Sequence, residues 1–324
     1  MRRRHLLQAT GVLVSAAVPR LGLAQAYPTK PIRYIVPVPA GGGNDMIARV
    51  VTERWSRLLG QPFVIENQSG GGGVIACQAT ARAAPDGYTL LQGFVATHGT
   101  SPATRRVNYD PVKDFTPIGM IGASPNVLAL HPGVPARTVQ EFVDYVKRNP
   151  GKVNYASAGN GSLTHLTMEL FKRDTGAFLV HIPYRGAAPA VTDLLGGQTQ
   201  AMFPGVATAL PHIRAGRLHA LAVTGKKRSA QLPDVPTMEE VGFKGFDAVQ
   251  WYGTLGPAGL RGDVVRHLNE TQVAVLKQPD LAERLTSEAV EPWAMGPEEF
   301  GRYIRSEVAR WSAVARARGI HLDE

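Results

Sequence analysis

The segment from Ile32 to Asp45 reads IRYIVPVPAGGGND. It begins with a β-rich run, Ile32 to Val38, and turns at three consecutive glycines. The apolar residues that follow recur at the spacing of one helix face: Met46, Ile47, Val50, Val51, Trp55, Leu58 and Leu59. A strand, a glycine turn and a helix in this order predict the opening unit of an α/β fold.

The same alternation continues along the chain. Strand-like runs occupy 63–66, 89–94, 127–130, 153–156, 179–183, 218–224 and 248–255. Helix-like segments occupy 74–84, 138–148, 162–173, 263–277 and 297–318. This rhythm predicts mostly parallel sheets that helices cover on both faces. A length of 324 residues, 44% of them hydrophobic, suits two such domains.

The first 26 residues are typical of an export signal. Three arginines, Arg2 to Arg4, precede an apolar run from Leu6 to Val18, and Ala24-Gln25-Ala26 forms a small-residue cleavage site. We therefore expect residues 1–26 to be a signal peptide cleaved near Ala26, and the mature protein to be periplasmic. The sequence leaves Sec and twin-arginine export open. An uncleaved anchor helix is the alternative, and Arg20 argues against it.

Cleavage of that segment removes four arginines and lowers the formal net charge from +9 to +5. A mild basic excess suits an anionic ligand. The basic residues do not form a stripe with interleaved aromatics, so we expect no nucleic-acid partner.

Motifs for cofactor-dependent or hydrolytic chemistry are missing from the sequence. The glycine runs lack the Lys-Ser/Thr ending of a phosphate-binding loop, and G-x-G-x-x-G, G-x-S-x-G and H-E-x-x-H do not occur. The nine histidines have no metal-ligand spacing, and Cys77 is the single cysteine. We therefore expect no catalytic residue, no metal and no cofactor, and a protein that is not an enzyme.

The first candidate ligand loop follows the strand at 32–38. Its glycines let the backbone approach a ligand, and the helix start beyond them offers free N–H groups to an anion. Asp45 either complements the helix dipole or contacts the ligand. The residues predicted to bind are Ala40, Gly41, Gly42, Gly43, Asn44 and Asp45.

The second candidate loop joins the strand at 153–156 to the next helix. Small hydroxyl side chains, glycines and a helix start again favour a carboxylate, although Ser162 could also be a plain N-cap. His165 lies in the first helical turn, where a structural role is favoured over that of a catalytic base. The residues predicted to bind are Ser157, Gly159, Asn160, Gly161, Ser162 and Thr164.

Two weaker candidate loops come later in the chain. Arg185 could pair with a carboxylate through both guanidinium arms, or could be an ordinary surface arginine. Phe203 and Gly205 belong to the second weak loop, 203–205, and complete the predicted ligand set. The segment 94–98 could form a wall of the cleft.

Seven segments together carry a family resemblance. They read, in chain order, YPTKPIRYIVPVPAGGGNDMIAR, APDGYTLL, YDPVKDFTPI, NYASAGNGSLTHLTMELFK, IPYRGAAPAVTDLLGGQ, LPHIRAGRLHALAV and LPDVPTMEEVGF. In this order and spacing the chain resembles the Bug-type, TctC-like extracytoplasmic receptors of tripartite tricarboxylate transporters, across essentially the whole mature sequence.

The resemblance implies two doubly wound α/β domains that close on a ligand in a Venus flytrap arrangement. Domain 1 would comprise 27–126 plus 251–324, and domain 2 would comprise 127–250. The ligand would be a small carboxylate, held largely by backbone amides and bridging waters of the two glycine-containing loops. The partners would be membrane subunits of a tripartite transporter, and we expect the receptor to be a monomer.

Two other functions remain open from the sequence. One is a ligand-sensing receptor that signals to a membrane partner. The other is a periplasmic hydrolase that uses Ser162 and His165, although no third group to orient them is in view.

Overall fold

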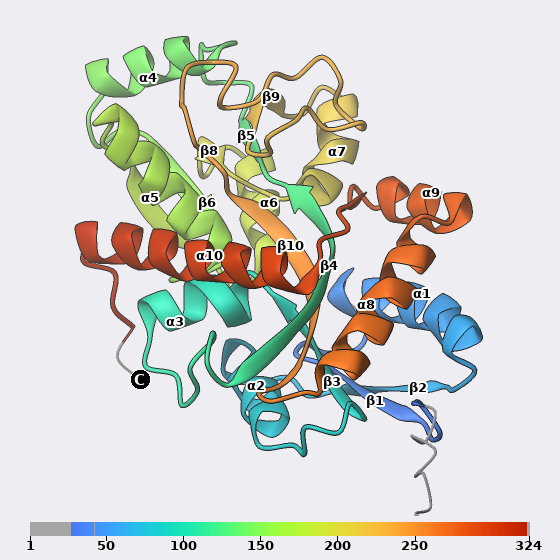
Figure 1. The fold of residues 1–324 in the computed structure, drawn as a ribbon. Helices are drawn as coiled ribbons and strands as arrows, with labels where there is room; N and C mark the ends of the chain where they lie inside the picture. Colours follow the sequence, from blue (N-terminus) through green and yellow to red (C-terminus); the bar gives the residue numbers. More distant parts are fainter. Residues whose placement is uncertain (1–26, 42, 323–324) are drawn as a thin grey trace, which may run out of the picture.

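The structure is a computed structural model that describes residues 27–41 and 43–322. The predicted signal peptide, 1–26, and Gly42 lie outside the described residues. The fold is α/β, as predicted, and consists of two separate sheets flanked by helices (Figure 1).

The first sheet has the strand order β11-β4-β10-β3-β1-β2. Its strands are β1 (Ile32–Val36), β2 (Phe63–Asn67), β3 (Thr89–Phe94), β4 (Phe115–Pro125), β10 (Val249–Pro257) and β11 (Glu291–Pro292). Its helices are α1 (Gly43–Leu59), α2 (Val74–Ala81), α3 (Ser101–Thr104), α8 (Gly262–Leu276), α9 (Pro279–Ser287) and α10 (Pro297–Ala317).

Alternating side chains of β1 lie on opposite faces of this sheet. Tyr34 packs with apolar residues of α1, α8 and α9, whereas Ile35 packs with residues of α2 and α10. Period-2 alternation therefore buries both faces, as expected for a sheet sandwiched between helices.

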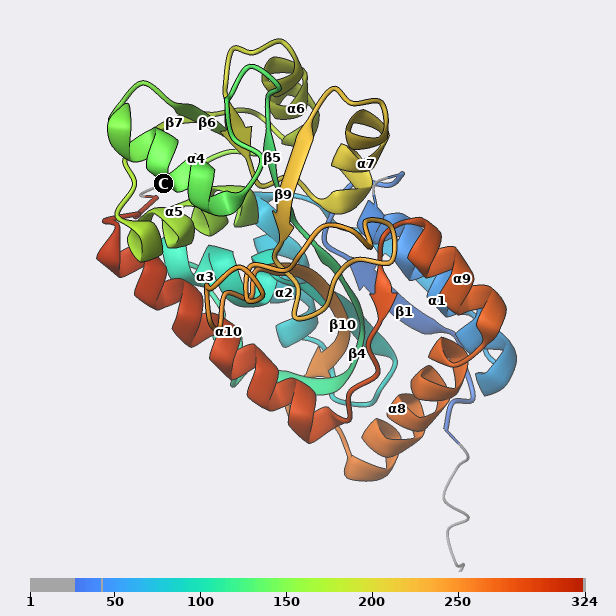
Figure 2. The ribbon, with the colours of Figure 1, turned by 90° about the horizontal axis from the view of Figure 1, so that it is seen from above.

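The second sheet has the strand order β7-β6-β8-β5-β9. Its strands are β5 (Val127–Leu130), β6 (Asn154–Ser157), β7 (Val180–Pro183), β8 (Ala201–Met202) and β9 (His219–Val223). Its helices are α4 (Val139–Arg148), α5 (Leu163–Thr175), α6 (Ala187–Leu195) and α7 (Val206–Arg214). Seen from above, α10 lies beside α3 and α5, so it contacts helices of both sheets (Figure 2).

The chain passes between the sheets at two adjacent places. The first is Asn126, between β4 and β5, and the second is the start of β10. The hydroxyl of Thr224 accepts the backbone N–H of Asn126 at 2.9 Å and donates to the carbonyl of Ala248 at 2.6 Å. One side chain therefore ties both crossings to the end of β9.

The sheets are mixed, which corrects the expectation of mostly parallel pairing. Strands β1, β2 and β3 are parallel, and so are β6, β7 and β8. Strand β10 is antiparallel to β3 and β4, and β5 is antiparallel to β8 and β9. The reason is the double crossing, because the returning strand β10 must run against the outgoing strand β4.

Candidate functional site

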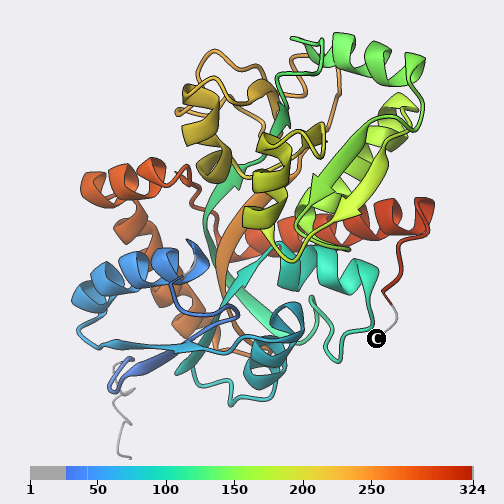
Figure 3. The same cartoon turned by 180° about the vertical axis from the view of Figure 1, so that it is seen from behind.

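A cavity of about 480 Å³ opens between the two sheets. Residues of α1 and of the segment after β3 line it from the first sheet, and residues of α5, α6 and α7 line it from the second. Figure 3, the view from behind, shows α1 (blue) below α6 and α7 (yellow). The crossing strands close the remaining side through Ser124, Asn126, Gln250 and Tyr252.

Four helices begin at this cavity. The lining residues are Gly43 and Asn44 of α1, Ser162 to Thr164 at the start of α5, Ala187 of α6, and Gly205, Ala207 and Thr208 at the start of α7. Helix starts carry unpaired N–H groups and a partial positive charge. Gly186 and Gly205, the N-caps of α6 and α7, provide no side-chain acceptor for those groups. The N–H of Thr208 already donates to the carbonyl of Gly205 at 3.1 Å, and Pro189 has no N–H. The first two residues of each helix are therefore the ones whose N–H groups an anion can bind.

Asn44 adds a side-chain donor to the first of these helix starts. Its Nδ2 is buried and makes no hydrogen bond within the part of the chain that the structure describes. A buried amide donor without a partner is costly, so a ligand acceptor at this place would satisfy it.

The cavity contains no positive side chain among its described lining residues. Glu288 is the one carboxylate among these described residues, and Arg284 pairs with it at 3.4 Å. Apolar groups supply much of the remaining wall, namely Met46, Ile47, Phe94, Val95, Leu163 and Val290. The site thus combines neutral hydrogen-bond donors with an apolar wall, which suits an anion on a hydrocarbon body.

Asp45 shapes the first loop from within. Its Oδ2 accepts the backbone N–H of Gly41 and the Nε of Arg49, both at 2.9 Å, and its Oδ1 accepts the Nδ2 of Asn67 at 2.9 Å. The hydrogen bond from Arg49 is the main reason why the pKa of Asp45 is lowered to about 2. Asp45 lies outside the cavity lining, and its contacts are with the loop and with α1.

The second loop is also held by its own side chains. Thr164 Oγ1 accepts the backbone N–H of Ala158 at 2.8 Å, and Ser162 Oγ donates to the carbonyl of Gly159 at 2.6 Å. Ser162 Oγ also accepts the N–H of His165 at 3.3 Å and so caps α5. Both hydroxyl residues line the cavity, so the capping and ligand-loop roles of Ser162 are compatible.

His165 and Ser162 do not form a nucleophile–base pair in the described structure. The Nδ1 of His165 accepts the backbone N–H of Gly161 at 3.1 Å, and the hydroxyl hydrogen of Ser162 points to Gly159. The geometry therefore gives the hydrolase alternative no support.

The structure brings five of the predicted ligand residues to the cavity: Gly43, Asn44, Ser162, Thr164 and Gly205. The other described members of the predicted set lie outside its lining: Ala40, Gly41, Asp45, Ser157, Gly159, Asn160, Gly161, Arg185 and Phe203. Of these, Phe203 is a core side chain and Arg185 is exposed. Direct ligand contact by any residue stays a prediction.

Sequence reasoning missed the crossing strands as part of the cavity wall. Ser124, Asn126, Gln250 and Tyr252 carry no motif, and the strand that contains Ser124 was not predicted. The signal that could have located them is period-2 alternation across the two predicted crossings.

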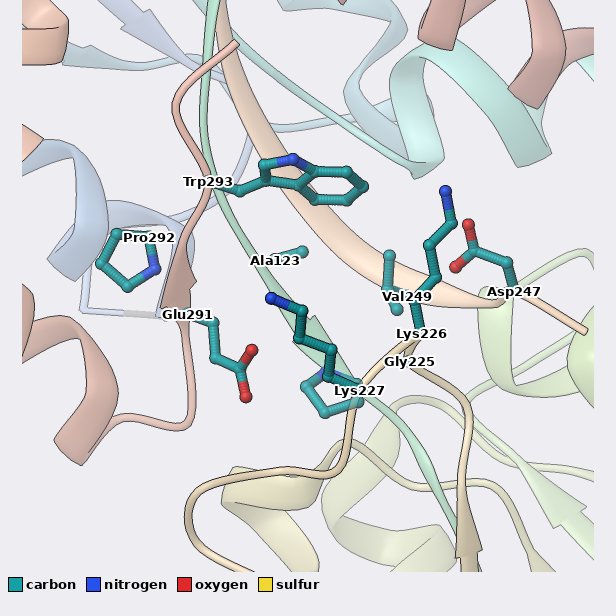
Figure 4. A pocket seen from close by; sticks show the side chains of 10 residues that line it. Ala123, Gly225, Lys226, Lys227, Asp247, Val249, Glu291, Pro292 and Trp293 are labelled. Atoms are coloured by element: carbon teal, nitrogen blue, oxygen red, sulfur yellow. The ribbon is translucent and has the colours of Figure 1, made fainter. Parts of the chain in front are cut away.

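The opposite face of the crossing strands borders a smaller cavity of about 240 Å³ (Figure 4). Ala123, Pro125 and Val249, which alternate with the residues facing the first cavity, line it together with Lys226 and Trp293, among others. No helix start opens into it, and the Nζ of Lys226 lies 5.7 Å from the centre of the Trp293 ring. We therefore place the candidate ligand site in the larger cavity.

Two structural features are absent from residues 27–41 and 43–322. No helix in these ranges has the length and apolar character needed to cross a membrane. No group of three or more histidine, cysteine, aspartate or glutamate side chains there is arranged to hold a metal ion.

Known proteins are similar to this chain over most of its length. The sequence family described as TctC, "Tripartite tricarboxylate transporter family receptor", matches residues 47–320. Protein BugT of Bordetella pertussis is 35% identical over 333 residues, which cover 99% of this chain and 100% of that protein.

Two solved structures are similar over nearly the whole chain. A protein of R. palustris with adipate is 34% identical and has a TM-score of 0.78, covering 92% of this chain and 100% of that one. MatC from Rhodopseudomonas palustris with bound malate is 33% identical and has a TM-score of 0.74, covering 89% and 99%.

Proposed function

Because the chain belongs to the TctC family of tripartite tricarboxylate transporter receptors, we propose that it captures a small carboxylate in the cavity between its two sheets. The family consists of periplasmic solute-binding receptors that serve transport. The ligand proposed here is a small acid with an apolar carbon chain, released to membrane subunits of a tripartite transporter.

The observation that carries this proposal is the meeting of four helix starts at one cavity. A carboxylate needs hydrogen-bond donors, and the lining offers N–H groups and Asn44 instead of charged side chains. Backbone N–H groups at helix starts bind an anion without any charged side chain. Two relatives with known ligands, adipate and malate, support an acid of this size.

We propose that capture is coupled to closure of two lobes, 27–126 plus 251–324 and 127–250. The donors come from helices of both sheets, so one ligand would bridge the lobes and favour the closed arrangement. The role of 1–26 as a leader cleaved near Ala26, and the periplasmic location of the mature chain, belong to the same proposal.

A thermal-shift panel tests the proposal. Malate, adipate and other small mono- and dicarboxylates are added to the purified protein, with the corresponding amides as uncharged controls. A ligand at one hundred times its Kd stabilises by about 2.7 kcal/mol, which raises the Tm by several degrees. A panel in which no acid raises the Tm more than its amide would contradict carboxylate capture.

A further inference from the structure

Two stacked histidines contact the second loop, residues 157–164. The ring centres of His165 and His181 are 4.0 Å apart, and their planes differ by 6°. Tyr155 continues the stack below His181, at 4.7 Å and 14°. Neither imidazole lines the ligand cavity, and nothing in the proposed capture so far uses them.

Each imidazole holds one residue of the loop. The backbone N–H of Gly161 donates to Nδ1 of His165 at 3.1 Å, and Ser157 Oγ lies 2.6 Å from Nε2 of His181. Ser157 Oγ also accepts the N–H of Gly159 at 3.1 Å. The two rings thus fix the segment from which Ala158, Ser162 and Thr164 line the cavity.

The hydrogen bond from Gly161 determines the state of His165. A backbone N–H can only donate, so Nδ1 must carry a lone pair and the ring must be neutral, with its proton on Nε2. A second proton on His165 would place two N–H groups against each other and break the contact.

From this geometry we propose that His165 and His181 are positioning residues, which as a neutral stacked pair hold the loop 157–164 in its ligand-binding shape. The proposal rests on the capture function above and concerns how one wall of that site is kept in place.

The surroundings keep the pair neutral near pH 7. Burial is the largest effect and lowers the pKa of both histidines to about 4. The positive charge of Lys172 also lowers both pKa values. Glu169 opposes this shift, but its carboxylate is already bound by Lys172, Tyr155 and Arg318, at 2.5, 2.6 and 2.5 Å respectively. These groups, with the opposite imidazole, are the titratable and charged neighbours of the stack on α5, β6, β7 and the end of α10.

Hydrogen exchange of the 157–164 segment tests the holding role without any ligand. His165→Phe keeps an aromatic ring but lacks the acceptor, so the exchange of this segment should become about tenfold faster. His165→Gln can accept through its side-chain oxygen and should stay closer to wild type. His267→Phe, on the exposed face of α8, is the matched control. Unchanged exchange in His165→Phe would overturn the proposal.

Calorimetry with adipate and malate then tests the consequence for binding. His165→Phe should weaken the affinity of the acid that binds about tenfold, and Ser157→Ala should act in the same direction through His181. Between pH 7 and pH 4 the affinity of wild type should fall more than that of His165→Gln. Protonation of the ligand's carboxylates affects both proteins equally, but only wild type has an imidazole at position 165 that can gain a proton. Equal pH profiles would contradict the positioning role.

The two measurements separate this proposal from the capture function. If no acid binds wild type, capture fails, and the exchange rates still decide whether the histidines hold the loop. If an acid binds wild type and His165→Phe equally well, capture stands and the positioning role is wrong.

Discussion

The hydroxyl of Thr224 donates a 2.6 Å hydrogen bond to the carbonyl of Ala248 and, on its other side, accepts the N–H of Asn126. Asn126 and Ala248 belong to the two chain segments that cross between the sheets. This buried side chain therefore links the two segments beside the cavity that Asn126 lines. The backbone of Thr224 links them as well, because its N–H donates to the carbonyl of Asn126 at 2.9 Å and its carbonyl accepts the N–H of Ala248 at 3.4 Å.

Removal of this hydroxyl should destabilise the protein. Thr224→Val keeps the shape of the side chain and leaves the N–H of Asn126 without its acceptor, so we expect a loss of about 1–3 kcal/mol in the free energy of unfolding. Urea denaturation measures it. Thr192→Val, at an exposed position of α6, should change stability by less than about 0.5 kcal/mol. Equal effects at the two sites would contradict a special role for Thr224.

Gly161 should be intolerant of a side chain for two separate reasons. Its φ is +71°, and a Cβ would lie 2.7 Å from Leu322 Cδ1 and 2.8 Å from Thr104 Oγ1. Gly176 has a similar φ of +66° but open space around a Cβ. Gly176→Ala should cost about 1–2 kcal/mol from the backbone conformation alone.

Gly161→Ala should cost about 1–3 kcal/mol more than Gly176→Ala, because the added methyl group must displace its neighbours. Chemical denaturation of both variants gives the difference. If the two substitutions cost the same, the second loop does not pack against Thr104 and the C-terminal segment as the structure has it.

Asp45 should matter to the first loop although it lies outside the cavity. Asp45→Asn weakens the contacts with Gly41 and Arg49, and we expect a loss of about 1 kcal/mol in stability together with weaker ligand binding. Because the folded-state pKa is depressed from 3.8 to about 2, the stabilisation is present above pH 3.8 and is lost as the pH falls towards 2.

Denaturation at pH 5 and pH 7 should therefore give the same difference between wild type and Asp45→Asn. The control is Glu53→Gln, which removes an exposed pair with Arg57 and should leave both stability and affinity nearly unchanged. A difference that disappears already at pH 5 would contradict the depressed pKa.

The stacked histidines should make stability fall in mild acid. Their pKa values are depressed from 6.5 to about 4, so the folded state binds fewer protons than the unfolded state between these limits. The contribution is complete above pH 6.5 and is lost as the pH falls towards 4, with about 2–4 kcal/mol lost between pH 7 and pH 5.

Unfolding free energies of wild type and His165→Gln at pH 7 and pH 5 measure this loss, which should be smaller in the variant by about half. His267→Gln, an exposed control, should behave like wild type. A loss of equal size in His165→Gln would show that other groups cause the acid sensitivity.

Local patterns in the sequence were sufficient to predict most helices and strands. The strand at 89–94 and the strand at 127–130 have the predicted bounds, and the predicted family is confirmed by the TctC match and the Bug relative. The strand β4 was missed because its Gly and Pro residues weaken the β pattern, and it is held instead by pairing with β10.

The parts of the candidate site that consist of glycine-containing loops and helix starts could be predicted from the sequence. The parts that depend on tertiary packing could not. Glycines and helix starts located the loops around Asn44 and Ser162, which the structure brings to one cavity. The contributions of Gln250 and Tyr252 depend on which face of a long-range strand pair they occupy. The partners of Ser157 and Gly161 are likewise set by tertiary packing of α5 and β7, which short-range spacing does not specify.

A crystal structure of the protein with adipate or malate, whichever binds in the panel, would show where the carboxylate lies. We expect carboxylate oxygens within hydrogen-bond distance of backbone N–H groups at the start of α1 or at the starts of α5 to α7, with Asn44 Nδ2 as a further donor. A carboxylate that instead pairs with Lys226 or Lys227 beside Trp293, with the larger cavity free of ligand, would contradict it.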